Sequence, residues 1–336
     1  MYLVDSASDS VSSSAMAFPF DSTLRAAAQP IARLFSLPHL PDHFPTLVYA
    51  CLLFTAIHLV ISPFLSTRIF PESYGKLRTR RAVNNWNIQV VSLFHVFIVL
   101  PLAISCFGSE TLKADKLFGW DERVGVTVSV ACGYFLWDAL DAMINFDDFG
   151  FLIHGLFCFT LYMMTFRPFL GYFAPRFLLW ETSTIFLNVH RSVISCILTD
   201  SYRLSTHRTP SRVRSCLVSR FLDRTGYTGT TAQWINGVIL LSTFFSCRIV
   251  YGWYLTYQFM EALFSARAQL PTVYLVAFSV GNLALNTLNI IWFYKMVFAV
   301  RKRFDKETKP LTADNASTHS ATRSANETGN GYGAAN

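Results

Sequence analysis

The sequence is poor in charged residues. Asp, Glu, Lys and Arg make up 15% of its 336 residues, whereas 52% of the residues are hydrophobic, and a soluble domain carries about a quarter of its residues as charged ones. Apolar runs of about twenty residues recur along the chain, which is the length that crosses the hydrocarbon core of a bilayer. The composition therefore excludes a soluble globular domain and predicts an all-α, polytopic membrane protein.

The motifs of common catalytic and metal sites are also missing. The chain has no Gly-x-Ser-x-Gly, no His-Glu-x-x-His and no Gly-rich phosphate loop. Its seven cysteines include no Cys-x-x-Cys pair, and their irregular spacing indicates neither a disulfide framework nor a zinc site. Three histidines in the apolar runs, His95, His154 and His190, lack the spacing of metal ligands. We therefore expect no metal and no bound cofactor.

Seven apolar segments have the length of membrane spans. A Ser-rich tail without signal-peptide features precedes them over 1–43, and a polar tail, which we expect to be disordered, follows over 306–336. Within the first tail, residues 20–35 form either a short amphipathic helix interrupted at Pro30 or, as we favour, part of a mobile tail. The expected transmembrane helices cover residues 44–64, 85–106, 124–144, 149–166, 173–197, 233–258 and 272–299.

Lysine and arginine gather on one side of this expected topology. The link after the first span carries five basic residues between Arg68 and Arg81, and the link after the fifth carries six arginines between Arg203 and Arg224. Because basic loops favour the cytosolic side, we expect a lumenal N-terminus and a cytosolic C-terminus. The net charge of +7 is then a topology signal, and we expect no nucleic-acid partner.

One group of polar residues is predicted at the cytosolic face. Asp138 and Asp141 end the third span and His154 begins the fourth, and the short link between these spans makes them antiparallel neighbours. A carboxylate beside an imidazole orients it as a general base, so these three residues are catalytic candidates. Alternatively, they are interfacial residues at helix ends. His190 and Arg191, in the cytosolic half of the fifth span, are candidate substrate-binding residues that could join them.

A second group is predicted nearer the lumen. Glu181 and Arg248 have similar depths in the fifth and sixth spans, and an intramembrane pair of opposite charges most economically neutralises itself; we favour a structural ion pair. Asn188 lies near the middle of the fifth span. The seventh span carries a polar stripe of Asn282, Asn286 and Asn289. These asparagines either line a substrate cavity or hold the helices together.

The same segments resemble the TLC domain, the superfamily of ceramide synthases and translocon-associated membrane proteins. The resemblance rests on "RRAVNNWNIQVVSLFHVF", "YFLWDALDAM", "DDFGFLIHGLF" and "WETSTIFLNVH". Its most specific features are the aspartate that ends the third span, the histidine that opens the fourth, and Glu181 followed by Asn188. It covers residues 77–305, and the helix at 44–64 lies outside it. Small TLC-domain proteins of lipid homeostasis, in a fungal-like version, are the most similar.

The resemblance implies a six-helix bundle around a central cavity, in the endoplasmic reticulum. Ceramide synthases use a histidine pair at the start of the corresponding span, with acidic residues in the next one, to N-acylate a sphingoid base from acyl-CoA. In this chain His154 is followed by Gly155, and the paired aspartates are absent from "ETSTIFLNVHRSV".

Three functions follow from these features. The first is a membrane protein of lipid homeostasis that binds or influences membrane lipids. The second is an N-acyltransferase of sphingolipid synthesis, with acyl-CoA as co-substrate and His154 as general base. The third is a carrier of lipid or of a small solute. The sequence favours the first, and it leaves the lipid and the oligomeric state open.

Overall fold

The structure is a computed structural model that describes residues 18–146, 148–188 and 231–307. All regular structure within these residues is helical, and they contain no strand. The chain divides into two units, residues 1–290 and residues 291–336. The bundle and the sites considered below belong to the first unit, and the described part of the second is the end of one helix, up to residue 307.

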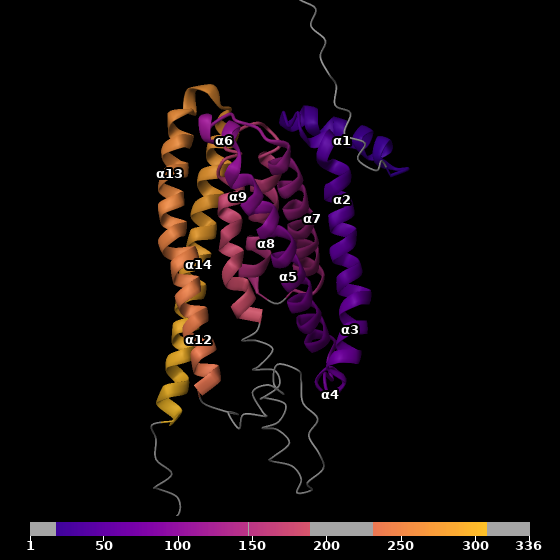
Figure 1. Ribbon diagram of the computed structural model, residues 1–336, viewed down its shortest axis with the longest axis vertical. Helices are drawn as coiled ribbons and strands as arrows, with labels where there is room; N and C mark the ends of the chain where they lie inside the picture. The colour runs from indigo at the N-terminus through magenta and orange to yellow at the C-terminus, as the bar shows by residue number, and fades with distance from the viewer. Residues whose placement is uncertain (1–17, 147, 189–230, 308–336) are drawn as a thin grey trace, which may run out of the picture. The chain divides into compact units, whose positions relative to one another are not determined.

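Five helical stretches are long and apolar enough to cross a membrane. Two of them contain a wider π-helical turn, η1 or η4, between two α-helices, and Figure 1 shows α2, α5, α7, α13 and α14 as long helices. The five stretches are Leu40–Ile69 (α2 Leu40–Ala56, η1 Ile57–Ile61, α3 Ser62–Ile69), Arg80–Gly108 (α5 Arg80–Ser105, η2 Cys106–Gly108), Glu122–Ile144 (α7), Ile235–Ser265 (in α12 Thr231–Phe244, η4 Phe245–Val250, α13 Tyr251–Ser265) and Thr272–Phe298 (in α14 Thr272–Glu307).

The expected all-α, multi-pass membrane protein is thus confirmed, whereas the count of seven spans is not. The helix α8, Phe149–Met164, is apolar but has only 16 residues. The next expected span is described up to residue 188, as α9 (Ala174–Phe177), η3 (Leu178–Glu181) and helical residues 182–188. Passages at 149–166 and 173–197 therefore stay predictions. The shorter elements are α1 (Asp21–Phe35), α4 (Pro71–Gly75), α6 (Glu110–Ala114) and η5 (Arg267–Gln269).

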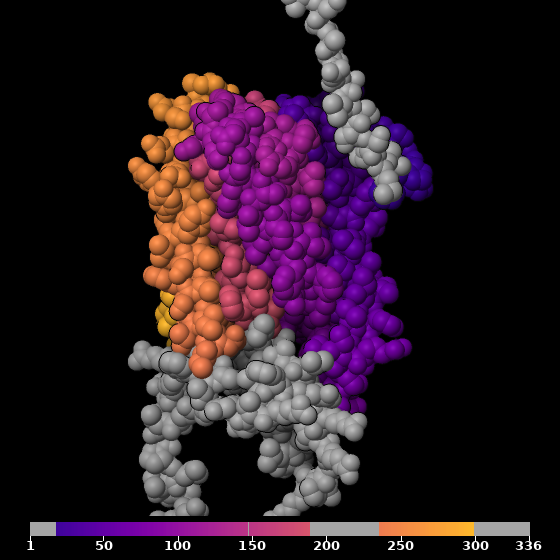
Figure 2. Space-filling view, in the orientation of Figure 1, coloured from indigo at the N-terminus to yellow at the C-terminus, as the bar shows by residue number. Residues whose placement is uncertain are grey.

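Helix α7 packs between α2 and α8, and small residues let these helices approach closely. A Cβ atom added at Gly133 of α7 would lie 2.6 Å from the Cβ of Ala50 and 2.7 Å from the carbonyl oxygen of Leu47, both in α2. The short link before Phe149 makes α7 and α8 neighbours, as expected. The outer side of the bundle is apolar instead of polar: along η4 and α13 (orange in Figure 2), Val250, Trp253 and Tyr257 are exposed, as lipid-facing residues are.

Residues 21–35 form a helix and not a mobile tail. Helix α1 continues through Pro30 and packs on α2 with Ala28 and Ala32 buried. The hydroxyl of Tyr49 in α2 donates a hydrogen bond of 2.8 Å to Asp21. The next helix begins at Leu40, four residues before the expected start. The prediction of a mobile tail is therefore wrong. Pro30 removes one backbone donor but does not end this helix.

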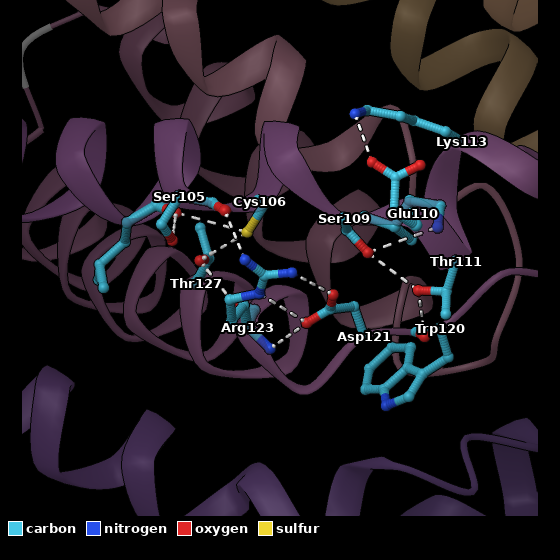
Figure 3. Close-up of polar contacts among 12 residues, drawn as sticks. Ser105, Cys106, Ser109, Glu110, Thr111, Lys113, Trp120, Asp121, Arg123 and Thr127 are labelled. Atoms are coloured by element: carbon cyan, nitrogen blue, oxygen red, sulfur yellow. Dashed lines mark hydrogen bonds and ion pairs between the residues drawn. The ribbon is translucent and has the colours of Figure 1, made fainter.

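One carboxylate fixes the connection between α5 and α7 (Figure 3). Asp121 caps α7 by accepting a hydrogen bond of 2.9 Å from the backbone N–H of Arg123. The guanidinium of Arg123 donates to both Asp121 oxygens at 3.1 and 2.9 Å, and to the carbonyl of Ser105 at 3.0 Å. The start of α7 is thereby tied to the end of α5. These hydrogen bonds, above all those from the Arg123 side chain, lower the pKa of Asp121 to about 2.

We expect Asp121→Ala to lower the free energy of unfolding by about 1 kcal/mol, since it removes a helix cap. Asp121→Asn keeps the capping oxygen and loses only the charge, so its loss should be smaller. Because the folded pKa lies below the ordinary 3.8, the carboxylate stabilises the protein above about pH 4, and this contribution disappears as the pH falls toward 2. Thermal unfolding in detergent at several pH values measures both effects, and equal midpoints for all three proteins would contradict them.

Candidate functional site

A cavity of about 70 Å³ lies among α7, α8, the segment from α9 to η3, α13 and α14. Its wall follows α8 from His154 to Thr165, which at about 1.5 Å per residue is a length of about 16 Å. Most of the wall is aromatic or aliphatic. The main apolar contributors are Phe135, Leu161, Phe173, Phe177, Phe259 and Phe278. The site is therefore a narrow, mainly apolar space inside the bundle.

A few polar groups interrupt this wall. His154 and Cys158 lie one helical turn apart on α8, with the Cys158 sulfur 3.7 Å from His154 Nδ1. Glu181 and Asn282 line the same cavity from η3 and α14. Trp180 is 6% exposed, and its indole N–H has no hydrogen-bond partner within the described residues. The polar groups of the lining are thus an imidazole, a thiol, a carboxylate and an amide, whereas the indole nitrogen of Trp180 lies against Gly252, 3.0 Å from a Cβ atom placed there.

His154 and Glu181, which the sequence predicts at different depths, line the same elongated cavity. Depth along each helix was inferred from sequence position alone. The α9–η3 segment combines a short α-helix with a 3-10 turn, which rises faster per residue than an α-helix. Equal residue counts therefore do not correspond to equal depths in this part of the chain.

The two aspartates expected near His154 have different surroundings. Asp138 lies against α8, where its Oδ2 would be 3.0 Å from a Cβ atom at Gly155. Asp141 belongs to another buried cluster. It accepts hydrogen bonds from Asn145 at 2.9 Å and from Asn84 at 3.3 and 3.4 Å. The structure therefore brings only Asp138 beside α8 at the level of His154.

The Asp141 cluster also includes His58, whose Nδ1 lies 3.8 Å from Asp141 Oδ1. Both side chains are 9% exposed. His58 comes from η1, in a helix that the resemblance to the TLC domain does not cover. Sequence reasoning missed this contact because it links the first span to α7 across more than eighty residues, and no spacing rule relates them.

Glu181 and Arg248 form a buried ion pair of 3.2 Å. All three nitrogens of the guanidinium are used. Nε donates to the carbonyl of Trp180 at 3.0 Å and to Ser183 at 3.1 Å. Nη1 donates to Asn289 at 3.2 Å, and Nη2 donates to Thr184 at 3.3 Å as well as to Glu181. Such complete pairing offsets the cost of burying a charge, so this arginine is held as a structural element.

The other polar candidates connect helices. Asn188 donates a hydrogen bond of 2.8 Å to Ser92 of α5. Asn286 donates to Thr256 of α13 at 3.0 Å and to Asn282 Oδ1 at 2.9 Å. Asn282 alone of these asparagines lines the cavity. His190 and Arg191 lie outside the described residues.

Sequence reasoning missed two lining residues that a simple spacing could have revealed. Cys158 and Tyr162 follow His154 at steps of four, so the three share one face of α8. Trp180 had no such signal, because its role depends on the turn of η3. Within the described residues, no group of three or more His, Cys, Asp or Glu side chains is placed to hold a metal ion.

The sequence model of the TLC domain matches residues 85–298. The chain is 30% identical to an uncharacterized TLC domain-containing protein of Schizosaccharomyces pombe, over 84% of this chain and 88% of that protein. It is 22% identical to topoisomerase I damage affected protein 4 of Saccharomyces cerevisiae (81% and 91%), and 27% identical to TLC domain-containing protein 4-B of Danio rerio (77% and 89%). No solved structure matches the chain significantly.

Arg248→Met should lower the free energy of unfolding by about 3–5 kcal/mol, because it leaves Glu181 buried without its cation. The double variant Arg248→Met/Glu181→Gln removes both charges and should lose less than the single variant. Arg267→Met, at an exposed arginine, controls for loss of a positive charge. Equilibrium unfolding in detergent micelles compares the four proteins, and an equal loss in the single and double variants would rule out the ion pair as the cause.

Gly155→His should destabilise the protein by about 1–3 kcal/mol. A Cβ atom at this position lies 3.0 Å from Asp138 Oδ2 and 3.1 Å from the backbone nitrogen of Ala139, so a side chain must push α8 away from α7. Thr160→His, at an exposed position of the same helix, is the matched control. Thermal midpoints that fall equally in both variants would show that the close approach of α7 and α8 is not responsible.

Proposed function

We propose that this chain, which belongs to the TLC-domain family, binds the hydrocarbon chain of a membrane lipid in its bundle and acts thereby in lipid homeostasis. The observation that carries the proposal is the narrow apolar cavity along α8. A site of this kind takes up apolar ligands, and a few placed polar groups fix their orientation.

The dimensions of the cavity suit an alkyl segment. A length of about 16 Å along α8 combined with a volume of about 70 Å³ describes a narrow space. Phenylalanine side chains from α7, α9, α13 and α14 surround it. An alkyl segment in this space would contact aromatic and aliphatic carbon along its length.

The polar groups suit the head of such a ligand. Asn282 supplies an amide to the lining, and His154 supplies an imidazole. An ester, amide or hydroxyl group of the ligand would form hydrogen bonds with these two side chains. This arrangement supports a lipid with a hydrogen-bonding group near the end of its acyl or alkyl chain.

The second candidate function is an acyl-CoA-dependent N-acyltransferase with His154 as general base. It is favoured by one observation, namely that His154 lines the apolar cavity on α8, the helix that Asp138 also contacts. Asp138 would orient the imidazole in this reaction. A carrier of lipid or of a small solute is the third candidate, and it needs an opening at both ends of the bundle.

We further propose that the protein resides in the endoplasmic reticulum membrane, with a lumenal N-terminus and a cytosolic C-terminus. The distribution of lysine and arginine along the sequence supports this orientation. Membrane lipids are the proposed partners, and sphingolipids are the proposed class only under the acyltransferase alternative.

The test compares lipids retained by the purified protein with the lipidome of the cells that produce it. Cys158→Phe fills the cavity from α8 and should abolish retention of the bound lipid. Thr160→Phe places the same ring on the exposed side of α8 and should change nothing. Mass spectrometry of the extracts measures retention, and thermal midpoints verify that each variant folds.

His154→Ala separates the first two candidates in cells that lack the native protein. Lipid binding without catalysis predicts that this variant restores the lipidome as well as wild type does. Loss of one lipid class with this variant, while the lipid is still retained by the purified protein, would establish the acyltransferase. Retention by Cys158→Phe at the wild-type level would exclude the cavity as the lipid site.

A further inference from the structure

We propose that a second pocket, beside α1, binds the phosphate group of a membrane phospholipid. This pocket has a volume of about 640 Å³ and opens between the end of α1, the start of α2 and the connection after α8. Its polar lining includes Arg33, Ser36, Asp42 and Arg167. It shares no lining residue with the cavity along α8, so it is a distinct site.

Positive side chains outnumber negative ones in the lining of this pocket. Asp42 is already paired with Arg25 at 2.8 Å. Arg33 and Arg167, in contrast, have no ion pair with any carboxylate within the described residues. Some cations of the described chain do have one, for example Arg123 with Asp121 and Lys113 with Glu110. Two arginines that lack a carboxylate therefore line one pocket and suit an anion.

The side chain of Arg167 is positioned by an aromatic ring. The guanidinium of Arg167 lies 5.0 Å from the ring centre of Tyr274 in α14. The hydroxyl of Tyr274 donates a hydrogen bond to the carbonyl of Phe35, at the end of α1. The backbone N–H of His39 also donates to the carbonyl of Phe166, at 3.2 Å. Both walls of the pocket are thus joined, and Arg167 is held on a fixed aromatic surface.

Helix α1 places the pocket at the level of lipid headgroups. Its surface carries exposed apolar side chains at Ile31, Leu34 and Phe35, and Leu34 is 76% exposed. An amphipathic helix of this kind lies in the membrane interface with its apolar side toward the acyl chains. Arg33 is on the same helix and lines the pocket, so its guanidinium lies where lipid phosphates are.

The chemistry of the pocket favours a phosphate over other anions. Arginine presents several N–H donors in a planar arrangement that matches two phosphate oxygens at once. Ser36, in the left-handed turn that ends α1 (φ 53°), adds a hydroxyl to the lining. The acyl chains of the same lipid would then lie against the apolar side of α1.

The test uses the full-length protein in detergent micelles and three probes: dioctanoyl phosphatidylglycerol, dioctanoylglycerol without a phosphate, and inorganic phosphate. Native mass spectrometry counts bound lipid, and thermal unfolding reports stabilisation. We expect wild type to bind the phospholipid in preference to the other two probes. Arg33→Gln/Arg167→Gln should bind it at least about tenfold more weakly, since two charge-assisted hydrogen-bond donors are lost.

Arg267→Gln removes an exposed arginine outside the pocket and should bind as wild type does. Arg33→Lys/Arg167→Lys keeps both charges and should bind the phospholipid more tightly than the Gln variant. If the double Gln variant does not fold, Arg33→Gln alone, at an exposed residue, replaces it. Cys158→Phe should leave this binding intact, which separates it from the proposed acyl-chain site.

Two results would overturn the proposal. Equal binding of the phospholipid by wild type and by the Gln variants would show that these arginines do not form the site. Equal effects of the phospholipid and of either other probe would show that the pocket recognises a free anion or only acyl chains.

Discussion

The buried guanidinium of Arg248 constrains several segments of the bundle at once. An ionised guanidinium at membrane depth needs a partner for its donors, and here the partners come from three places. Trp180 and Glu181 lie in η3, Thr184 lies in the helical residues that follow, and Asn289 lies in α14. The π-helical turn η4 holds Arg248 itself. Moving any of these segments would leave a buried charge incompletely paired.

The cavity along α8 depends on this arrangement. Trp180 and Glu181 form part of its wall and are also partners of Arg248. Asn282 lies two turns before Asn289 on α14, so the same helix contributes to both. A structural ion pair beside a ligand site has a clear benefit, because it fixes the wall without occupying the space. Glu181 therefore does not need a catalytic role to explain its presence among apolar residues.

The sequence predicted the class of the protein, because composition is a local property. It also predicted the partners Glu181 and Arg248, because opposite charges among apolar residues neutralise each other. The sequence did not predict contacts that depend on how separate helices pack together. Asp141 contacts His58 and Asn84 from other helices, and nothing in its own segment indicates this. Gly155 was noticed only as a missing histidine. A Cβ atom there would lie 3.0 Å from Asp138 Oδ2 and 3.1 Å from the backbone nitrogen of Ala139, so the absence of a side chain lets α7 and α8 approach closely.

The π-helical turns η1 and η4 affect what an inserted or deleted residue does to the helices that contain them. Each wider turn adds about one residue to the local repeat, which rotates the following helix by about 100° relative to the preceding one. The residues of α12 and α13 therefore belong to one continuous rod but to two different registers. A residue inserted in α12 and a residue deleted in α13 would restore both the length of the rod and the phase of the residues beyond the two changes, but the residues between them, including Arg248 in η4, would stay shifted by one position. In this rod, phase as well as length determines which side chains meet the bundle.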